Sequence, residues 1–321
     1  MRGIDLMARS TNPFGPNGWT PDRIASLDGK TFVITGANSG AGFEATRTLL
    51  TKGAKVVMLN RSAEKSATAL EELEKEFGAE ADVSLIRMDL AVLDSVREAA
   101  AEVLDQHASI DALICNAAIS QTATRKLTVD GIESQLGVNH MGHFLLCGLL
   151  YERIEASHGR IVVVGSNAYR MGKKQIHFDD LNFDEDYSPW HAYNQSKLAQ
   201  MTFGYELQRR VEAAGKDGAV QVCHPGASRT NLISGDVSTH HTLLIRLQKP
   251  FFQSAERGSW REVLCATEPD VKSETLYGPT RRADTAGPVG ECQLEDHALD
   301  RDAATRLWAV SEEKTGLNWS P

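Results

Sequence analysis

The chain has 321 residues, with 43 acidic and 34 basic side chains and a formal net charge of −9. An acidic protein of this kind is not expected to use nucleic acid as its main partner. A hydrophobic fraction of 41% and a charged fraction of 24% are typical of a globular protein with a sizeable core. The five cysteines are widely spaced and form no CxxC pair, which predicts reduced core residues in a cytoplasmic protein and neither a disulfide framework nor a metal site.

The chain carries no apolar stretch of 18 residues, so no transmembrane helix and no membrane partner are expected. Residues 1–27 lack the apolar core of a signal peptide and are rich in Pro, Gly, Asn and Thr. We interpret them as an irregular N-terminal arm that precedes a single domain over residues 28–321.

Short β-rich runs alternate with longer helical runs. The expected strands, almost wholly apolar, are Thr31–Thr35, Lys55–Asn60, Val83–Met88, Ala112–Asn116, Arg160–Gly165 and Val220–Cys223. The expected helices are Gly42–Lys52, Glu64–Phe77, Leu93–Gln106, Ile132–Ile154 and Tyr193–Ala214. This alternation predicts an α/β fold, with a doubly wound parallel sheet of the Rossmann type that is covered on both faces.

Three further stretches interrupt or follow this rhythm. Tyr169–Trp190 is polar and aromatic, and residues 231–260 mix apolar with polar side chains. We expect the second stretch to be a lid over the ligand edge of the sheet, which suggests an apolar or aromatic substrate. Simple packing of a lid helix on the core explains its apolar residues equally well. The C-terminal extension from Tyr277 is rich in Gly and Pro and ends in a helix at Asp302–Lys314.

Three glycines, Gly36, Gly40 and Gly42, lie between the first strand and the first helix. Glycines here permit a tight turn and let the backbone approach a pyrophosphate at the helix N-terminus. An ordinary loop can carry the same spacing, but the strand–turn–helix context favours a dinucleotide site. NAD sites commonly place an acid at the end of the second strand, whereas this chain has Asn60 and Arg61 there. Arg61 would pair with a 2′-phosphate, so NADP(H) is expected in preference to NAD(H).

Tyr193 and Lys197 are spaced one helical turn apart, on one face of an expected helix. A nearby ammonium lowers the pKa of a phenol, and such a tyrosine can exchange a proton with an alcohol or a carbonyl compound. Ser166 ends the fifth expected strand, where its hydroxyl can donate to a developing alkoxide. Each of these residues alone has an ordinary structural explanation, such as a turn cap or an exposed helix face.

In this order of motifs the chain resembles the short-chain dehydrogenase/reductase family over about residues 28–232. The matching segments are Thr35–Gly42, Asp89–Leu90, Asn116–Ala118, Asn139, Ser166, Tyr193 with Lys197, and Pro225–Thr230. The resemblance implies Asn139, Ser166, Tyr193 and Lys197 as the catalytic set, with Asn139 holding a water next to Lys197. Ala118 stands where the family motif usually has Gly.

The residues that we expect to bind the cofactor are Gly36, Asn38, Ser39, Gly40, Gly42, Arg61, Asp89, Leu90, Asn116, Ala117, Ala118, Tyr193, Lys197, Pro225, Gly226 and Thr230. The long insert before Tyr193 resembles that of retinol-dehydrogenase-like members. Many such relatives have an N-terminal membrane anchor; its absence here weakens any inference that the substrate is a retinoid.

The sequence therefore predicts an NADP(H)-dependent oxidoreductase that interconverts an alcohol and a ketone or aldehyde. Two alternatives on the same fold are a non-catalytic NAD(P)-sensing protein and a reductase of C=C bonds. Members of the family that this chain resembles often pair two long helices between subunits, here Ile132–Ile154 and Tyr193–Ala214. The resemblance therefore implies a homodimer, unless the insert beside these helices blocks the pairing.

Overall fold

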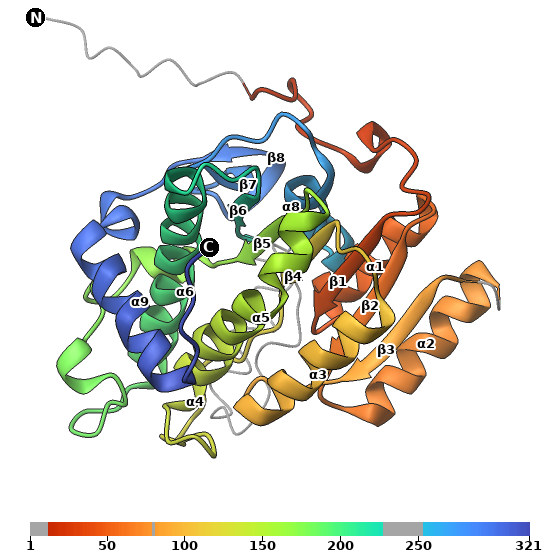
Figure 1. The fold of residues 1–321 in the computed structure, drawn as a ribbon. Helices are drawn as coiled ribbons and strands as arrows, with labels where there is room; N and C mark the ends of the chain where they lie inside the picture. The colour runs from red at the N-terminus through yellow and green to blue at the C-terminus, as the bar shows by residue number, and fades with distance from the viewer. Residues whose placement is uncertain (1–11, 79–80, 227–252) are drawn as a thin grey trace, which may run out of the picture.

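The computed structural model describes residues 12–78, 81–226 and 253–321, and an eight-stranded sheet runs through its centre (Figure 1). The strand order is β3-β2-β1-β4-β5-β6-β7-β8. The strands are β1 (Thr31–Thr35), β2 (Lys55–Asn60), β3 (Val83–Arg87), β4 (Ala112–Cys115), β5 (Arg160–Val164), β6 (Ala219–Cys223), β7 (Leu276–Arg281) and β8 (Ala286–Cys292). Strands β1 to β7 pair in parallel, and β8 runs antiparallel to β7. The predicted doubly wound, Rossmann-type sheet is confirmed.

Helices cover both faces of this sheet. One apolar core packs under α1 (Gly40–Thr51), α2 (Ala63–Phe77) and α8 (Ala255–Thr267). The other lies under α3 (Leu93–Gln106), α5 (Gly142–Ala156), α6 (Pro189–Ala213) and α9 (Arg301–Thr315). Burial from both sides explains why the central strands are apolar along their whole length.

The helix expected over Ile132–Ile154 is present from Ser134 to Ala156, but it is not α-helical throughout. A short α4 (Ser134–Leu136) leads into a π-helical turn, Gly137–Met141, and α5 follows at Gly142. At this point α5 lies very close to the loop after β3. A Cβ on Gly142 would be only 2.6 Å from the Leu90 carbonyl oxygen, so a larger residue would not fit there. Turns of the π type occur often at functional sites, and Asn139 is at the centre of this one.

The C-terminal extension is more regular than its Gly/Pro content indicates. Strands β7 and β8 form a hairpin at the end of the sheet, with a register shift between Pro279 and Arg281. Proline is tolerated in a strand at such irregularities and at sheet edges, so the hairpin is compatible with Pro279 and Pro288. The sequence analysis assigned no strand to residues 276–281 and 286–292, which form this hairpin.

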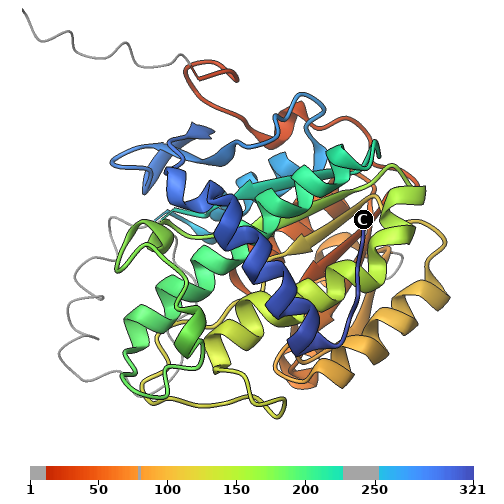
Figure 2. The same ribbon diagram turned by 60° about the vertical axis from the view of Figure 1, so that its left-hand side comes forward.

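The end of the chain packs onto the helices that were expected to form a dimer interface. Helix α9 packs against α6 and α5, and the last residues of the chain run back along α5 (Figure 2). The rings of Trp308 and Trp319 lie 5.2 and 5.5 Å from the ring of Phe144 on α5. Gly148 makes this approach possible, because a Cβ there would come within 2.3 Å of Leu317. Helix α9 and the segment after it therefore occupy the face that the expected pairing would use.

The described part of the N-terminal arm is irregular apart from the 3-10 turn Pro21–Arg23, but it is anchored. Trp19 is fully buried, forms a bridge with Val289 of β8 and donates through Nε1 to Glu268 over 2.7 Å. No helix among the described residues is long and apolar enough to cross a membrane.

The expected lid at residues 231–260 falls largely outside the described residues. Its last part, Ala255–Trp260, forms the first turns of α8. Helix α8 packs against α1 and the sheet rather than over a site.

Candidate active site

The turn between β1 and α1 has the close backbone approaches that a dinucleotide requires. Gly36 and Gly40 have φ values of 68° and 60°, in the left-handed region that favours glycine. A Cβ on Gly42 would lie 2.4 Å from Asn116 Nδ2 and 2.6 Å from the Gly36 carbonyl oxygen. Ser39 begins the helix without a side-chain capping bond, so the first N–H groups of α1 have no side-chain cap. This uncapped turn fits a cofactor pyrophosphate.

The loop after β4 supports this turn. Asn116 Nδ2 donates to the carbonyl oxygens of Thr35 and Gly36 over 2.8 and 3.2 Å. The backbone N–H of Ala117 donates to Thr35 Oγ1 over 3.0 Å. Asn116 and Ala117 are thus next to the glycine turn, as the sequence predicts, while Ala118 follows them in the same loop. Thr35 was not among the predicted residues.

The residues expected near the adenosine end follow β2 and β3. Arg61 is exposed directly after β2. The Asn60 side chain is 3% exposed, and both of its polar atoms lack a hydrogen-bond partner in the part of the chain described. Asp89 Oδ1 accepts from the Ala91 N–H over 3.0 Å, and Leu90 is buried beside it.

Asn38 lies at this end as well, because its Nδ2 donates to Ser66 Oγ of α2 over 3.3 Å.

Ser166 and Tyr193 meet at the carboxyl end of β5. The Ser166 side chain is close enough to Tyr193 to affect the pKa of its phenol, and Tyr193 is buried. Burial raises the pKa of the Tyr193 phenol, while the hydrogen bond with Ser166 acts in the opposite direction. The sequence predicted a helix from Tyr193 onward, but α6 already begins at Pro189, with Ser188 as its cap. The Ser-Pro pair was the signal for this earlier start.

Lys197 is buried one turn further along α6. Its Nζ donates to the Val164 carbonyl oxygen over 3.0 Å and to Gln200 Oε1 over 2.8 Å. Burial lowers the pKa of Lys197 to about 8, and the charge of Glu262 partly opposes this change. Lys197 is not among the groups that shift the pKa of Tyr193 here, so the lowering of that pKa by Lys197 stays a prediction.

Asn139 is held tightly, but by protein groups. Its Oδ1 accepts from the Ile119 N–H over 2.9 Å, and its Nδ2 donates to the Ile119 carbonyl oxygen and to Ser196 Oγ. Ser196 Oγ in turn donates to the Tyr193 carbonyl oxygen over 2.8 Å. Asn139 therefore connects the loop after β4 to the first turns of α6. That it also holds a water next to Lys197 stays a prediction.

Two buried histidines accompany Asn139. The ring of His143 is hydrogen bonded to Thr35 Oγ1 and to the Asn139 carbonyl oxygen, at 2.9 and 3.1 Å. His140 Nε2 lies 2.8 Å from Ser311 Oγ of α9. Burial lowers the pKa of His140 to about 3 and that of His143 to about 4, so both are neutral at pH 7.

The segment after β6 is only partly described. Gly226 follows Pro225 with a φ of 67°, and its N–H donates to His224 Nδ1 over 3.2 Å. A Cβ on Gly226 would come within 2.7 Å of the Thr285 carbonyl oxygen, so the β7–β8 turn lies against this segment. Thr230 lies outside the described residues.

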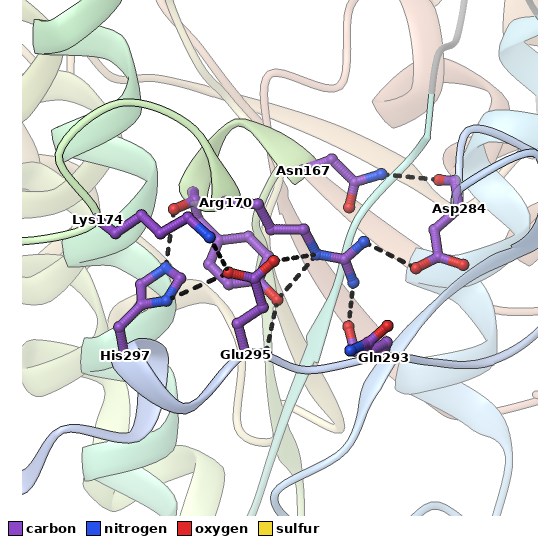
Figure 3. A network of polar contacts seen from close by, with 8 residues as sticks. Asn167, Arg170, Lys174, Asp284, Gln293, Glu295 and His297 are labelled. Atoms are coloured by element: carbon purple, nitrogen blue, oxygen red, sulfur yellow. Dashed lines mark hydrogen bonds and ion pairs between the residues drawn. The ribbon is translucent and has the colours of Figure 1, made fainter.

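A polar network that the sequence analysis missed holds the loop that follows Ser166 (Figure 3). Arg170 forms an ion pair with Asp284 of the β7–β8 turn, and Asn167 Nδ2 donates to the Asp284 carbonyl oxygen over 2.9 Å. Tyr169 accepts through its hydroxyl from the Glu295 N–H over 3.1 Å. These partners are more than 110 residues apart in sequence, and no local pattern connects them.

The sheet is of the Rossmann type and has a glycine turn after its first strand. Near the end of β5 it brings together Ser166, Tyr193 and Lys197. This arrangement is that of a nucleotide-dependent oxidoreductase. Comparison with known proteins agrees. The short chain dehydrogenase family matches residues 30–178. Human retinol dehydrogenase 14 is 38% identical over 312 residues, which cover 91% of this chain and 88% of that protein. Human retinol dehydrogenase 12 is 36% identical, with the same coverage.

A crystal structure of an uncharacterized protein from Mycobacterium paratuberculosis superimposes with a TM-score of 0.76 at 35% identity. The match covers 94% of this chain and 99% of that one. The chain belongs to the short-chain dehydrogenase family. It is an oxidoreductase that acts on CH–OH and C=O groups with NAD(P)(H), as the sequence predicted.

Proposed function

We propose that the protein is an NADP(H)-dependent oxidoreductase that interconverts an alcohol and a ketone or aldehyde, with Tyr193 as its acid and base. The observation that carries this proposal is the position of Ser166, just after β5, beside the buried Tyr193, with Lys197 one turn away on α6.

In the reducing direction, Tyr193 gives its phenolic proton to the carbonyl oxygen of the substrate. Ser166 donates a hydrogen bond to the same oxygen as negative charge develops on it. Lys197 provides a positive charge that favours the phenolate left on Tyr193. When bound, the nicotinamide supplies or accepts the hydride. Asn139 acts through the Ser196 bond, which holds the first turns of α6 in place.

The preference for NADP(H) rests on the end of β2. Asn60 and Arg61 occupy the position at which an acid would hold the ribose hydroxyls of NAD. Arg61 is exposed, and its guanidinium can donate hydrogen bonds to a 2′-phosphate. The residues proposed to bind the rest of the cofactor are those of the glycine turn, the loops after β3 and β4, and the segment from Pro225 to Thr230.

An apolar or aromatic substrate is supported by one feature near the catalytic tyrosine. Trp190 is 38% exposed and its ring centre lies 6.1 Å from that of Tyr193, which offers an aromatic surface beside the reacting group. The relatives named retinol dehydrogenase are consistent with such a substrate. A cytoplasmic location stays a prediction.

The experiment is a screen of apolar alcohols and carbonyl compounds with NADPH and NADP⁺, followed by Tyr193→Phe on the best substrate. We expect this variant to lose about 10²- to 10⁴-fold in kcat while cofactor binding is retained. The matched control is Tyr205→Phe on the same helix, whose buried hydroxyl has no hydrogen-bond partner among the described residues. Near-normal turnover in Tyr193→Phe would refute the assignment.

The same screen separates the alternatives. A sensing protein would bind the cofactor with no turnover, and a C=C reductase would give a product that keeps its carbonyl group.

A further inference from the structure

His143 of α5 is a buried polar residue that the proposed function does not use. The side chain is 1% exposed, and burial lowers the pKa of its ring to about 4, so the ring is neutral at pH 7. Both ring nitrogens are nevertheless hydrogen bonded. One bond leads to Asn139 of the catalytic set, and the other leads to Thr35 at the end of β1, beside the glycine turn. His143 therefore lies between two halves of the site.

The direction of each hydrogen bond follows from the chemistry of its partner. A backbone carbonyl oxygen can only accept, so Nδ1 of His143 carries the ring proton and donates it to Asn139 over 3.1 Å. Nε2 of the neutral ring is then an acceptor, and the Thr35 hydroxyl donates to it over 2.9 Å. The Ile114 carbonyl oxygen is a more distant acceptor for this hydroxyl, at 3.4 Å. The Thr35 oxygen in turn accepts from the Ala117 N–H over 3.0 Å. A chain of three hydrogen bonds thus runs from the loop after β4 to the π-helical turn.

The same helical turn holds the loop after β4 at a second point. The Asn139 side chain bonds to the N–H of Ile119 over 2.9 Å and to its carbonyl oxygen over 3.0 Å. His143 follows Asn139 by four residues, which is about one turn of helix. The loop is therefore fixed at Ala117 through Thr35 and His143, and at Ile119 through Asn139.

The position of this loop matters because Asn116, Ala117 and Ala118 are proposed to line the cofactor. This inference therefore rests on the proposed function. Asn116 also bonds to the carbonyl oxygens of Thr35 and Gly36, so a shift of the loop would reach the glycine turn. Misplacement of a positioning group by about 1 Å can cost roughly 10²-fold in rate.

We propose that His143 is a positioning residue: through Thr35 it holds the loop after β4, and it thereby fixes the bound nicotinamide cofactor relative to the Asn139 turn. His140, on the same turn, shows the contrasting structural case. Its Nε2 bonds to Ser311 of α9, its Nδ1 has no partner among the described residues, and neither nitrogen leads to the cofactor loop.

Three substitutions separate the roles of the two ring nitrogens. His143→Phe keeps the ring size and removes both nitrogens. His143→Gln places an amide oxygen near the position of Nε2, where it can accept from Thr35. His143→Asn places its amide near the position of Nδ1 and does not reach Thr35.

We expect the Phe and Asn variants to bind NADPH about tenfold more weakly than the wild type, and the Gln variant to restore most of the affinity. On the best substrate of the screen, kcat of the Phe variant should fall while the KM for that substrate is retained, because no substrate contact is removed. Fluorescence titration and steady-state kinetics give these values.

A double-mutant cycle tests whether His143 acts through Thr35. Thr35→Val keeps the side-chain shape and removes the hydroxyl, so it should weaken NADPH binding by about tenfold as well. Adding His143→Phe to this variant should weaken binding no further, since the chain is already broken. An additive loss of about 100-fold would show that the two residues act independently and would overturn the proposal.

His140→Phe is the matched control, because it also removes a buried imidazole and keeps an aromatic ring beside Phe144 and Phe203. It should lower the midpoint of urea denaturation and leave NADPH affinity unchanged. An equal loss of affinity in His140→Phe, or wild-type affinity and kcat in a folded His143→Phe variant, would overturn the proposal.

NMR of the wild-type protein with ¹⁵N-labelled histidine tests the chain without any variant. The His143 ring should carry its proton on Nδ1, and the Nε2 resonance should move when NADP⁺ is added. A proton on Nε2, or no response to NADP⁺ at saturation, would overturn the proposal. Failure of the wild-type protein to bind either cofactor would refute the proposed function together with this inference. Normal cofactor binding with unaffected His143 variants would refute this inference alone.

Discussion

Arg170 Nη1 lies 2.9 Å from Asp284 Oδ2, and this ion pair joins the loop that follows Ser166 to the turn between β7 and β8. Both side chains are largely buried, at 17% and 16% exposure. The turn itself contains three consecutive residues with positive φ, Arg282 to Asp284, and its Thr285 carbonyl oxygen lies close to Gly226. Together with the bond from Asn167 Nδ2 to the Asp284 carbonyl oxygen, this ion pair connects the loop that follows Ser166 with the segment after β6 through the β7–β8 turn.

Arg170→Ala should lower the free energy of unfolding by about 2–4 kcal/mol, because it leaves Asp284 buried without its partner. Urea denaturation followed by fluorescence would measure this loss. Arg306→Ala removes an exposed ion pair with Asp179 and should leave the midpoint unchanged. Equal effects of the two substitutions would contradict the importance of the buried pair.

Ser166→Ala should move the pH profile of alcohol oxidation to higher pH. Oxidation needs the deprotonated form of Tyr193, so its rate rises with pH through the pKa of that phenol. The hydrogen bond from Ser166 lowers this pKa, and its removal leaves the effect of burial unopposed. The measurement is kcat/KM against pH, with Ser166→Thr as the variant that restores the hydroxyl. An unchanged profile in Ser166→Ala would show that the bond does not tune Tyr193.

Arg61→Ala should weaken NADPH binding by about 10- to 100-fold, towards the value for NADH, since a charge-assisted bond to the 2′-phosphate is lost. Fluorescence titration with both cofactors would show this. Arg301→Ala, an exposed arginine on α9, is the control and should change neither value. A preference for NADH that persists in the Arg61 variant would reject the NADP(H) proposal.

Gly42→Ala should reduce the affinity for either cofactor by about tenfold or more, because the added methyl group meets Asn116 Nδ2 and the Gly36 carbonyl and forces the turn to shift. Gly215→Ala also changes a glycine, with a φ of 68° but with no atom within 4 Å of the new Cβ. This control should lose some stability and keep its cofactor affinity. Both values come from titrations on folded protein.

Trp319→Ala should lower the free energy of unfolding by about 3–5 kcal/mol, because Trp319 is buried against Phe144, Tyr151 and Trp308. Loss of this cover also exposes the apolar face of α5, and light scattering would then show concentration-dependent self-association. Trp190→Ala is the control for the loss of an exposed indole and should affect stability little. A stable Trp319 variant would indicate that α5 does not depend on the C-terminal segment.

Local sequence was sufficient for the elements whose signals are local. The positions of strands β1 to β6 followed from residue type, and most clearly for the central strands, because a strand buried on both faces must be apolar along its length. The glycine turn was also predicted correctly in place and conformation, since Gly36 and Gly40 adopt backbone angles that other residues avoid. The spacing of Tyr193 and Lys197 was enough to place both on one face of α6.

Tertiary structure decided everything that depends on partners distant in the chain. The hairpin of β7 and β8 forms despite its prolines, because β6 offers a free edge for pairing. At the π-helical turn, the Asn139 side chain is hydrogen bonded to Ile119 and to Ser196, which lie 20 and 57 residues away in the sequence. The sequence by itself determined the family and the strand order of its motifs, whereas packing determined what covers α5 and how the loop that follows Ser166 is held. The physical reason is that burial and long-range hydrogen bonds are properties of the assembled chain, and no local pattern of residues encodes them.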